Sequence, residues 1–249
     1  MQNAWLDAAV KMGAIARGVA TVHLIMSITL VTIAILKWRD LRDRARATRG
    51  FAGSFTAALA AGDVPRALSQ CASHAKSQVA VVLGAALRAA SPFVGRREDA
   101  EYAASIAEIA ADREQVLVTG QLRSGLNALA AIGATATLLG LLGTVVGIFN
   151  SFAALARSGG GSVEAIAGGA GEALLTTALG LVVAIPALWL YTYFSGRLER
   201  AGRELDYAVQ ELIEWIMVHG TVATAAVVSD ADFGAVIAGP PHVMAVEIV

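Results

Sequence analysis

The stretch GEALLTTALGLVVAIPALWL, at residues 171–190, is an apolar run with one charged residue, Glu172, near its start. It belongs to a longer segment, 166–196, that contains no other Asp, Glu, Lys or Arg. About 20 apolar residues are enough for a helix to cross the roughly 30 Å hydrocarbon core of a bilayer. We therefore interpret 166–196 as a membrane-spanning helix.

Two further segments, 18–36 and 126–152, are also long, apolar and free of charged residues. The 249-residue chain is 56% hydrophobic and 16% charged, with a mean hydropathy of +0.62, which is more apolar than a soluble domain needs. Helices satisfy their own backbone hydrogen bonds in lipid, so the long apolar runs fit helices. The sequence predicts an all-α integral membrane protein with three transmembrane helices.

The remaining segments are more polar and divide the chain further. Residues 1–17 are predicted to be an N-terminal amphipathic segment in the outer interface, and 153–165 a short loop. Residues 37–125 are predicted to form a cytoplasmic helical region. Residues 197–249 are expected to continue the third helix and then end in a tail.

Within 37–125, Asp63 is a plausible helix start because Pro65 follows it, and the run SPFVG at 91–95 predicts a break. From about Arg97 the helical pattern continues into the second apolar run. Within this pattern, Gly120 and Gly125 are the residues that most disfavour a continuous helix. The pattern predicts one long helix that emerges from the membrane.

Lys and Arg flank the apolar runs unevenly, whereas the loop 153–165 contains only Arg157. Short loops rich in these residues stay on the cytoplasmic side. The imbalance predicts a periplasmic N-terminus and a cytoplasmic C-terminus. The residues concerned are Lys37, Arg39, Arg42, Arg44, Arg46, Arg49, Arg113, Arg123, Arg197, Arg200 and Arg203.

Glu172 has two interpretations. A carboxylate about six residues into a membrane helix is costly, so it faces protein or water and by default indicates a proton or ion path. If the helix instead starts later, Glu172 is an interfacial first-turn residue that is favoured by the positive helix end. Position alone leaves both open.

Hydroxyl groups and glycines accompany this glutamate. Thr176 lies one turn after Glu172 on nearly the same face, Thr177 about 100° further round, and Thr144 on the second apolar run. Each hydroxyl can line a hydrated path or bond back to its own helix. Three glycines, Gly140, Gly143 and Gly147, form a smooth face that lets another helix approach closely.

Several classes of chemistry have no motif in the sequence. Cys71 is the single cysteine, so we interpret it as a small buried hydrophobe, and His23 as a satisfied or interfacial histidine. The glycines at 159–161 lack the Lys of a phosphate-binding loop. A net charge of −1 does not favour nucleic acid. We expect no enzyme activity, cofactor or metal.

Two blocks carry a resemblance to a known family. IGATATLLGLLGTVVGIFNSF at 132–152 is similar to a GLxGTVxGI signature, and GEALLTTALGLVVAIPA at 171–187 to an AEALxATAxGLxxAIPA signature. The chain thus resembles the MotA/TolQ/ExbB proton-channel family. Three helices with a large segment between the first two agree with its ExbB and TolQ members, whereas MotA needs a fourth helix. The departures are Thr137, Thr176 and Gly168–Gly169.

The resemblance implies a homo-oligomeric ring, typically of five copies, in the bacterial inner membrane. Such a ring encloses the single helices of an ExbD- or TolR-type partner and energises a TonB- or TolA-like periplasmic rod. By motif position, Glu172 matches the family's helix glutamate, while Thr144 and Thr177 match its pore-facing threonines.

These expectations predict an ExbB-like, proton-motive-force-driven subunit that energises TonB-dependent transport. One alternative is a TolQ-like subunit of the Tol-Pal envelope system. Another is a passive membrane scaffold without proton flux.

Overall fold

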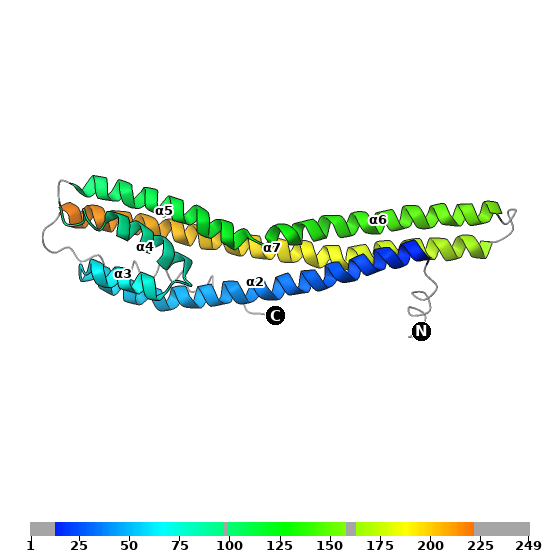
Figure 1. Ribbon diagram of the computed structural model, residues 1–249, viewed down its shortest axis with the longest axis horizontal. Coiled ribbons are helices and arrows are strands. Elements are labelled where there is room, and N and C mark those ends of the chain that lie inside the picture. Colours follow the sequence, from blue (N-terminus) through cyan, green and yellow to red (C-terminus); the bar gives the residue numbers. More distant parts are fainter. Residues whose placement is uncertain (1–12, 97–98, 158–162, 222–249) are drawn as a thin grey trace. The chain divides into compact units, whose positions relative to one another are not determined.

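The computed structural model describes residues 13–96, 99–157 and 163–221. The predicted amphipathic stretch before Gly13, the glycine-rich loop at 158–162 and the tail after Thr221 lie outside the described residues. Every regular element in the described ranges is a helix, as the sequence predicts. In chain order these are α2 (Ala14–Ala60), α3 (Val64–Ser73), α4 (Gln78–Ala90), α5 (Ala100–Arg123), α6 (Leu126–Arg157) and α7 (Val163–Thr221) (Figure 1).

Three helical stretches of the described chain are long and apolar enough to cross a membrane by length and composition. They lie within Ala14–Ala60, Ala100–Arg157 and Ile166–His219, and each contains one of the three predicted spans. α2 begins at Ala14, four residues before the predicted span at 18–36. α7 continues without interruption past 196 to Thr221 with Pro186 inside it, so the predicted extension of the third helix is confirmed.

The chain forms two compact units. The membrane unit comprises residues up to Lys37 together with Gly125–Ser195, and the polar unit comprises Trp38–Ser124 and the residues from Gly196 onward. The membrane unit contains the apolar part of α2, all of α6 and the first part of α7. The polar unit contains the remainder of α2 and α7 with α3, α4 and α5.

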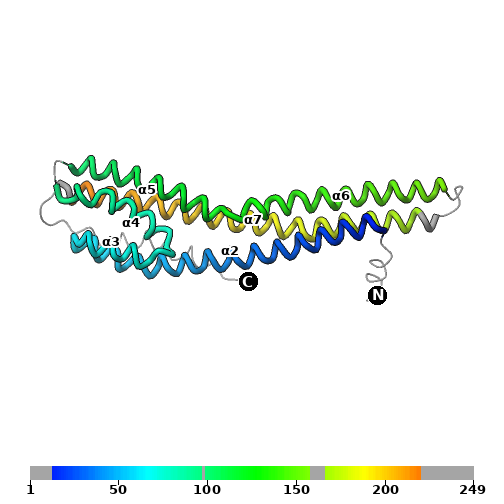
Figure 2. The backbone as a smooth tube through the Cα atoms, viewed as in Figure 1, coloured from blue at the N-terminus to red at the C-terminus, as the bar shows by residue number. Residues whose placement is uncertain are grey.

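In the polar unit, side-chain caps start the short helices where the sequence allows them. Asp63 accepts a hydrogen bond from the backbone N–H of Arg66 at 2.9 Å, and Ser77 accepts one from that of Ala80 at 3.2 Å. The predicted start at Asp63 is thus confirmed, as is the break at 91–95, because α4 ends at Ala90. α4 packs against α3 and α5 (Figure 2).

The core of the polar unit is closely packed and contains the single cysteine. The rings of Phe51 and Phe55 lie 4.8 Å apart and are fully buried. Cys71 is buried too, as predicted, and a Cβ added at Gly84 would lie 2.9 Å from its Cβ. Burial raises the pKa of the Cys71 thiol to about 12, although the charge of Arg88 and a backbone hydrogen bond lower it. The thiol is therefore an inert part of the core.

The predicted continuous helix from Arg97 through the second apolar run is wrong at one point. α5 ends at Arg123 and α6 begins at Leu126. Gly125 has a φ of 82°, a left-handed conformation that favours glycine, and the Ser124 N–H donates to the Gly120 and Gln121 carbonyls. Gly125 therefore ends the helix rather than merely weakening it.

In the membrane unit, α6 and α7 pack at very short range. A Cβ added at Gly147 would lie 2.8 Å from that of Ala173, and one added at Gly133 would lie 2.9 Å from Leu188. The earlier residue of α6 thus meets the later residue of α7, so the two helices are antiparallel (Figure 1). Small residues allow this backbone approach, as is typical of membrane helices.

The outward faces of the membrane unit are apolar. Large hydrophobic side chains stand exposed on α2, α6 and α7, a pattern that suits lipid and that monomeric soluble proteins rarely show. They include Leu24, Ile25, Ile28, Val31, Ile35, Leu138, Leu141, Val145, Phe149, Phe152, Leu174, Val182, Ile185 and Trp189.

Candidate functional site

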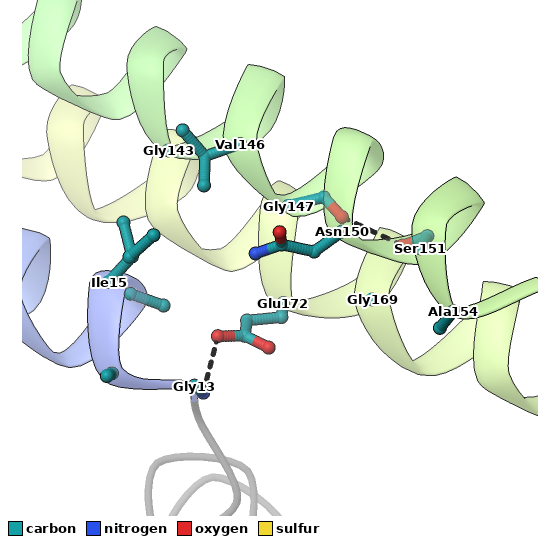
Figure 3. Close-up of a pocket in the computed structure, with 12 residues that line it drawn as sticks. Gly13, Ile15, Gly143, Val146, Gly147, Asn150, Ser151, Ala154, Gly169 and Glu172 are labelled. Atoms are coloured by element: carbon teal, nitrogen blue, oxygen red, sulfur yellow. Dashed lines mark hydrogen bonds between the residues drawn. The ribbon is translucent and has the colours of Figure 1, made fainter. Parts of the chain in front are cut away.

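Glu172 lies on α7 in the membrane unit and is half-buried. Its Oε1 accepts a hydrogen bond of 2.7 Å from the backbone N–H of Gly13 (Figure 3). The Arg17 N–H donates to the Gly13 carbonyl at 3.0 Å, so Gly13 is the residue at which the hydrogen bonding of α2 begins. The first N–H groups of a helix have no partner within it and form its positive end. Glu172 thus caps α2 from another helix.

The carboxylate opens into a cavity of about 360 Å³. The first turn of α2 lines one side, and Asn150 and Ser151 of α6 line another. Figure 3 shows the Asn150 amide extending toward Glu172, while the Ser151 hydroxyl donates to the Gly147 carbonyl at 2.8 Å. The cavity combines an acid, an amide and backbone groups, which are groups that can hold water or a proton.

Two of the predicted packing glycines, Gly143 and Gly147, line this cavity, whereas Gly140 lies outside it. A Cβ at Gly143 would overlap the Thr176 side chain, and one at Gly140 would lie 3.1 Å from the Thr176 carbonyl oxygen. At Gly169, an added Cβ would overlap the Ser151 hydroxyl. All three glycines therefore stand where α6 and α7 leave no room for a side chain.

The three predicted threonines lie outside the cavity lining. Thr144 donates to the Leu141 carbonyl at 2.6 Å, and Thr176, fully buried, donates to that of Ala173 at 2.7 Å, so both bond back to their own helices. Thr177 differs, since it donates across to the Gly140 carbonyl of α6 at 3.0 Å. The structure thus brings Glu172 together with Gly143 and Gly147 but not with these threonines.

His23 makes a second polar link between α2 and its neighbours. It is 2% exposed, and its ring nitrogens lie 2.8 Å from the Val19 carbonyl of its own helix and 3.0 Å from the Ala136 carbonyl of α6. A Cβ at Gly180 of α7 would lie 3.3 Å from Nε2. Both partners are carbonyl oxygens, so the ring nitrogen that carries the proton donates to one of them, as expected of a satisfied histidine, and the side chain contacts both its own helix and α6.

Sequence reasoning missed Gly13 and Asn150. No local pattern signals Gly13, because its role comes from a backbone N–H that meets a residue 159 positions away. Asn150 carried a weak signal, as an amide within an uncharged apolar run. The pairing of His23 with Ala136 likewise depends on the packing of two helices.

Two further observations concern the ionisable groups of the described residues. No three His, Cys, Asp or Glu side chains in the described ranges gather as a metal site would need. In the polar unit, burial raises the pKa of Glu204, while the charges of Arg200, Arg197 and Arg203 lower it.

The sequence model of the MotA/TolQ/ExbB proton channel family matches residues 70–206, which is more than half of the chain. The matched part includes α6, the membrane part of α7 and Glu172. The chain therefore belongs to the MotA/TolQ/ExbB proton channel family. The three apolar helices and this membership together indicate an inner-membrane protein.

Curated relatives match over shorter stretches. The chain is 49% identical over 75 residues to the biopolymer transport protein ExbB of Xanthomonas campestris, covering 30% of each chain. It is 44% identical over 88 residues to ExbB of Neisseria gonorrhoeae, covering 35% of this chain and 40% of the relative. To the Tol-Pal system protein TolQ of Pseudomonas aeruginosa it is 44% identical over 89 residues, covering 35% and 38%. The alignments thus span about a third of the length of these relatives.

Proposed function

We propose that this chain is an ExbB-like subunit of a proton-motive-force-driven motor that energises TonB-dependent transport. The observation that carries the proposal is the Glu172 carboxylate in a cavity of the membrane unit. Among the described residues its hydrogen-bond partner is the uncharged Gly13 N–H, and no described Lys or Arg lines the cavity. A carboxylate at such a place is costly, and membrane proteins keep such groups where protons or ions move.

The energy available fits this role. One elementary charge that crosses the membrane potential releases about 2.3 kcal/mol per 100 mV, so several protons per cycle can drive mechanical work. In this proposal, copies of the chain form a ring around the single helices of an ExbD- or TolR-type partner. The exposed apolar faces of α6 and α7, which include Leu141, Phe149 and Leu174, support contacts with other membrane helices as well as with lipid. Five copies is the number that the family resemblance implies.

We propose that the N-terminus lies in the periplasm and the polar unit in the cytoplasm, because Lys and Arg flank the spans unevenly. Cys71 is buried, so a labelling test needs new thiols in a Cys71→Ala background. Ala45 and Ala156 are both exposed alanines on opposite predicted sides. An impermeant maleimide added to intact spheroplasts should label Ala156→Cys and spare Ala45→Cys. The reverse pattern would overturn the orientation.

A TolQ-like role in the Tol-Pal system is the second candidate, since a TolQ relative matches over 89 residues and an ExbB relative over 88, both at 44% identity. A deletion strain separates the two. The ExbB-like role predicts loss of energy-dependent uptake across the outer membrane, which re-expression restores and a protonophore abolishes. The TolQ-like role predicts detergent sensitivity and division defects with normal uptake. Normal uptake and a normal envelope would favour a passive scaffold.

A further inference from the structure

The start of α2 and the Glu172 carboxylate form a contact that the proposed function does not by itself require. Oε1 of Glu172 lies 2.7 Å from the Gly13 nitrogen, and a Cβ added at Gly13 would lie 3.2 Å from the same oxygen. Glycine therefore leaves the space that the carboxylate occupies. The contact holds one carboxylate oxygen, while the other remains on the cavity side (Figure 3).

The electrostatic surroundings make this contact sensitive to protonation. An N–H at a helix start is an effective partner for a negative charge, and charge-assisted hydrogen bonds are roughly twice as strong as neutral ones. The charged side chains that α2 and α6 present at this end, Arg17 and Arg157, are exposed and do not line the cavity. On α7, the next titratable residue after Glu172 is Tyr191. Among the described residues, the Gly13 N–H is thus the group that competes with a proton for this carboxylate.

We propose that Gly13 is a positioning residue, whose N–H fixes the Glu172 carboxylate against the start of α2 and makes α2 the helix that responds when Glu172 takes up a proton. The inference rests on the proposed function for its purpose, since it states how a proton taken up in the cavity changes a contact between helices. Protonation replaces a charge-assisted hydrogen bond with a weaker neutral one, and so loosens the first turn of α2 from α7.

The test removes the donor and keeps the acid. Gly13→Pro deletes the N–H, and proline is well tolerated at the start of a helix. Gly13→Ala keeps the N–H and adds the Cβ that proline also brings, 3.2 Å from Oε1, so it isolates the effect of that Cβ. Ala14→Pro adds the same ring one residue later and keeps the Gly13 N–H. These two variants are the matched controls. All are made in the full chain, in native membranes that contain the complete complex.

The readout is the rate at which dicyclohexylcarbodiimide, an apolar reagent that reacts with protonated carboxyl groups, modifies Glu172 as a function of pH. Mass spectrometry of the peptide that contains Glu172 quantifies it, and Glu172→Gln gives the background. We expect Gly13→Pro to be labelled about threefold to tenfold faster than the parent where labelling is partial, with its profile moved toward higher pH. Ala14→Pro should keep the parent profile, and Gly13→Ala should move it less than Gly13→Pro does.

A second variant keeps the test decisive if Gly13→Pro does not reach the membrane. Glu172→Asp retains the charge but is one methylene shorter, so its carboxylate no longer reaches the Gly13 N–H, and its labelling should also extend to higher pH. Profiles of Gly13→Pro or Glu172→Asp that match the parent would overturn the positioning role. Because labelling needs no motor output, that result would leave the proton-driven function standing, and loss of that function would not alter the labelling result.

Discussion

Between α6 and α7 the backbones approach so closely that methyl groups added at Gly143 or Gly169 would overlap side chains of the other helix, whereas α2 meets the pair through polar links at Glu172 and His23. The first contact involves glycine, alanine, serine and threonine, none of which titrates. The second involves two titratable side chains. The two contacts thus differ in kind: α6 and α7 are held by close backbone packing, while α2 is held to them by polar groups, of which Glu172 is the one that we propose responds to protonation.

The largest effect is expected from a substitution that disrupts the packing of α6 against α7. Gly143→Ala places a methyl group where the Thr176 side chain stands, and overpacking of this kind costs about 1–3 kcal/mol. We expect a marked fall in the thermal unfolding temperature of the purified protein and in the amount inserted in membranes. Circular dichroism during heating measures the first and immunoblotting of membranes the second.

The matched control is Gly168→Ala, because nothing lies within 4 Å of a Cβ added there. It should be neutral or slightly stabilising. Adding Thr176→Gly to Gly143→Ala removes all three atoms that obstruct the methyl group and should recover part of the loss. If Gly143→Ala unfolds at the same temperature as Gly168→Ala, the close packing described for α6 and α7 is wrong.

A smaller effect is expected for the polar link of α2. His23→Leu removes the contact with the Ala136 carbonyl and should cost about 0.5–1.5 kcal/mol, since one hydrogen bond between membrane helices is lost. Unfolding by increasing fractions of denaturing detergent measures it. Thr29→Val is the control, because Thr29 is exposed and donates to the Ile25 carbonyl of its own helix. Equal unfolding of the two variants would argue against the link.

The smallest effect is expected in the polar unit, where the free energy of unfolding should depend on pH through one glutamate. Burial raises the pKa of Glu204, so the folded state favours its neutral form, and the stability it lends at low pH is lost as pH rises through the raised value. Glu204→Gln should therefore be more stable than the parent at pH 8. The difference should vanish below about pH 4, where the parent is protonated in both states.

Thermal unfolding at several pH values tests this expectation. The effect is small because Glu204 is only half-buried, and solvent screens its charge. Glu199→Gln serves as the control, since Glu199 is an exposed residue on the same helix. A Glu204→Gln variant that is less stable than the parent at pH 8 would contradict the assigned sign.

Much of the fold followed from the sequence, because length and hydropathy decide where helices enter a membrane. The start of α3 at Asp63 was predictable for a local reason, a cap followed by proline. Gly125 was harder, since glycine is also common within membrane helices and only its positive φ makes it a terminator.

The candidate site was predictable only in part. Glu172 was predictable as a charged residue in an apolar run, and Gly143 and Gly147 as a smooth helix face. The partner of Glu172 was not predictable, because any residue has a backbone N–H and the packing of α2 on α7 brings Gly13 to the carboxylate. The bond of Thr177 to the Gly140 carbonyl likewise required the spacing of two helices.

The central claim is that the Glu172 carboxylate couples the proton motive force to work. Glu172→Gln keeps size and hydrogen-bonding ability but cannot ionise, so insertion and assembly should be at least as good as in the parent. Thr144→Val and Thr177→Val should be milder, because each removes one hydroxyl group.

The most direct measurement is therefore energy-dependent uptake across the outer membrane in a deletion strain that expresses Glu172→Gln at parental level, with native gels of mild-detergent extracts as the control for assembly. A coupling role for Glu172 predicts that uptake falls to the level seen with a protonophore while assembly stays normal. Full energy-dependent uptake in that strain would contradict it, and Glu172 would then be an interfacial residue of the first turns of α7.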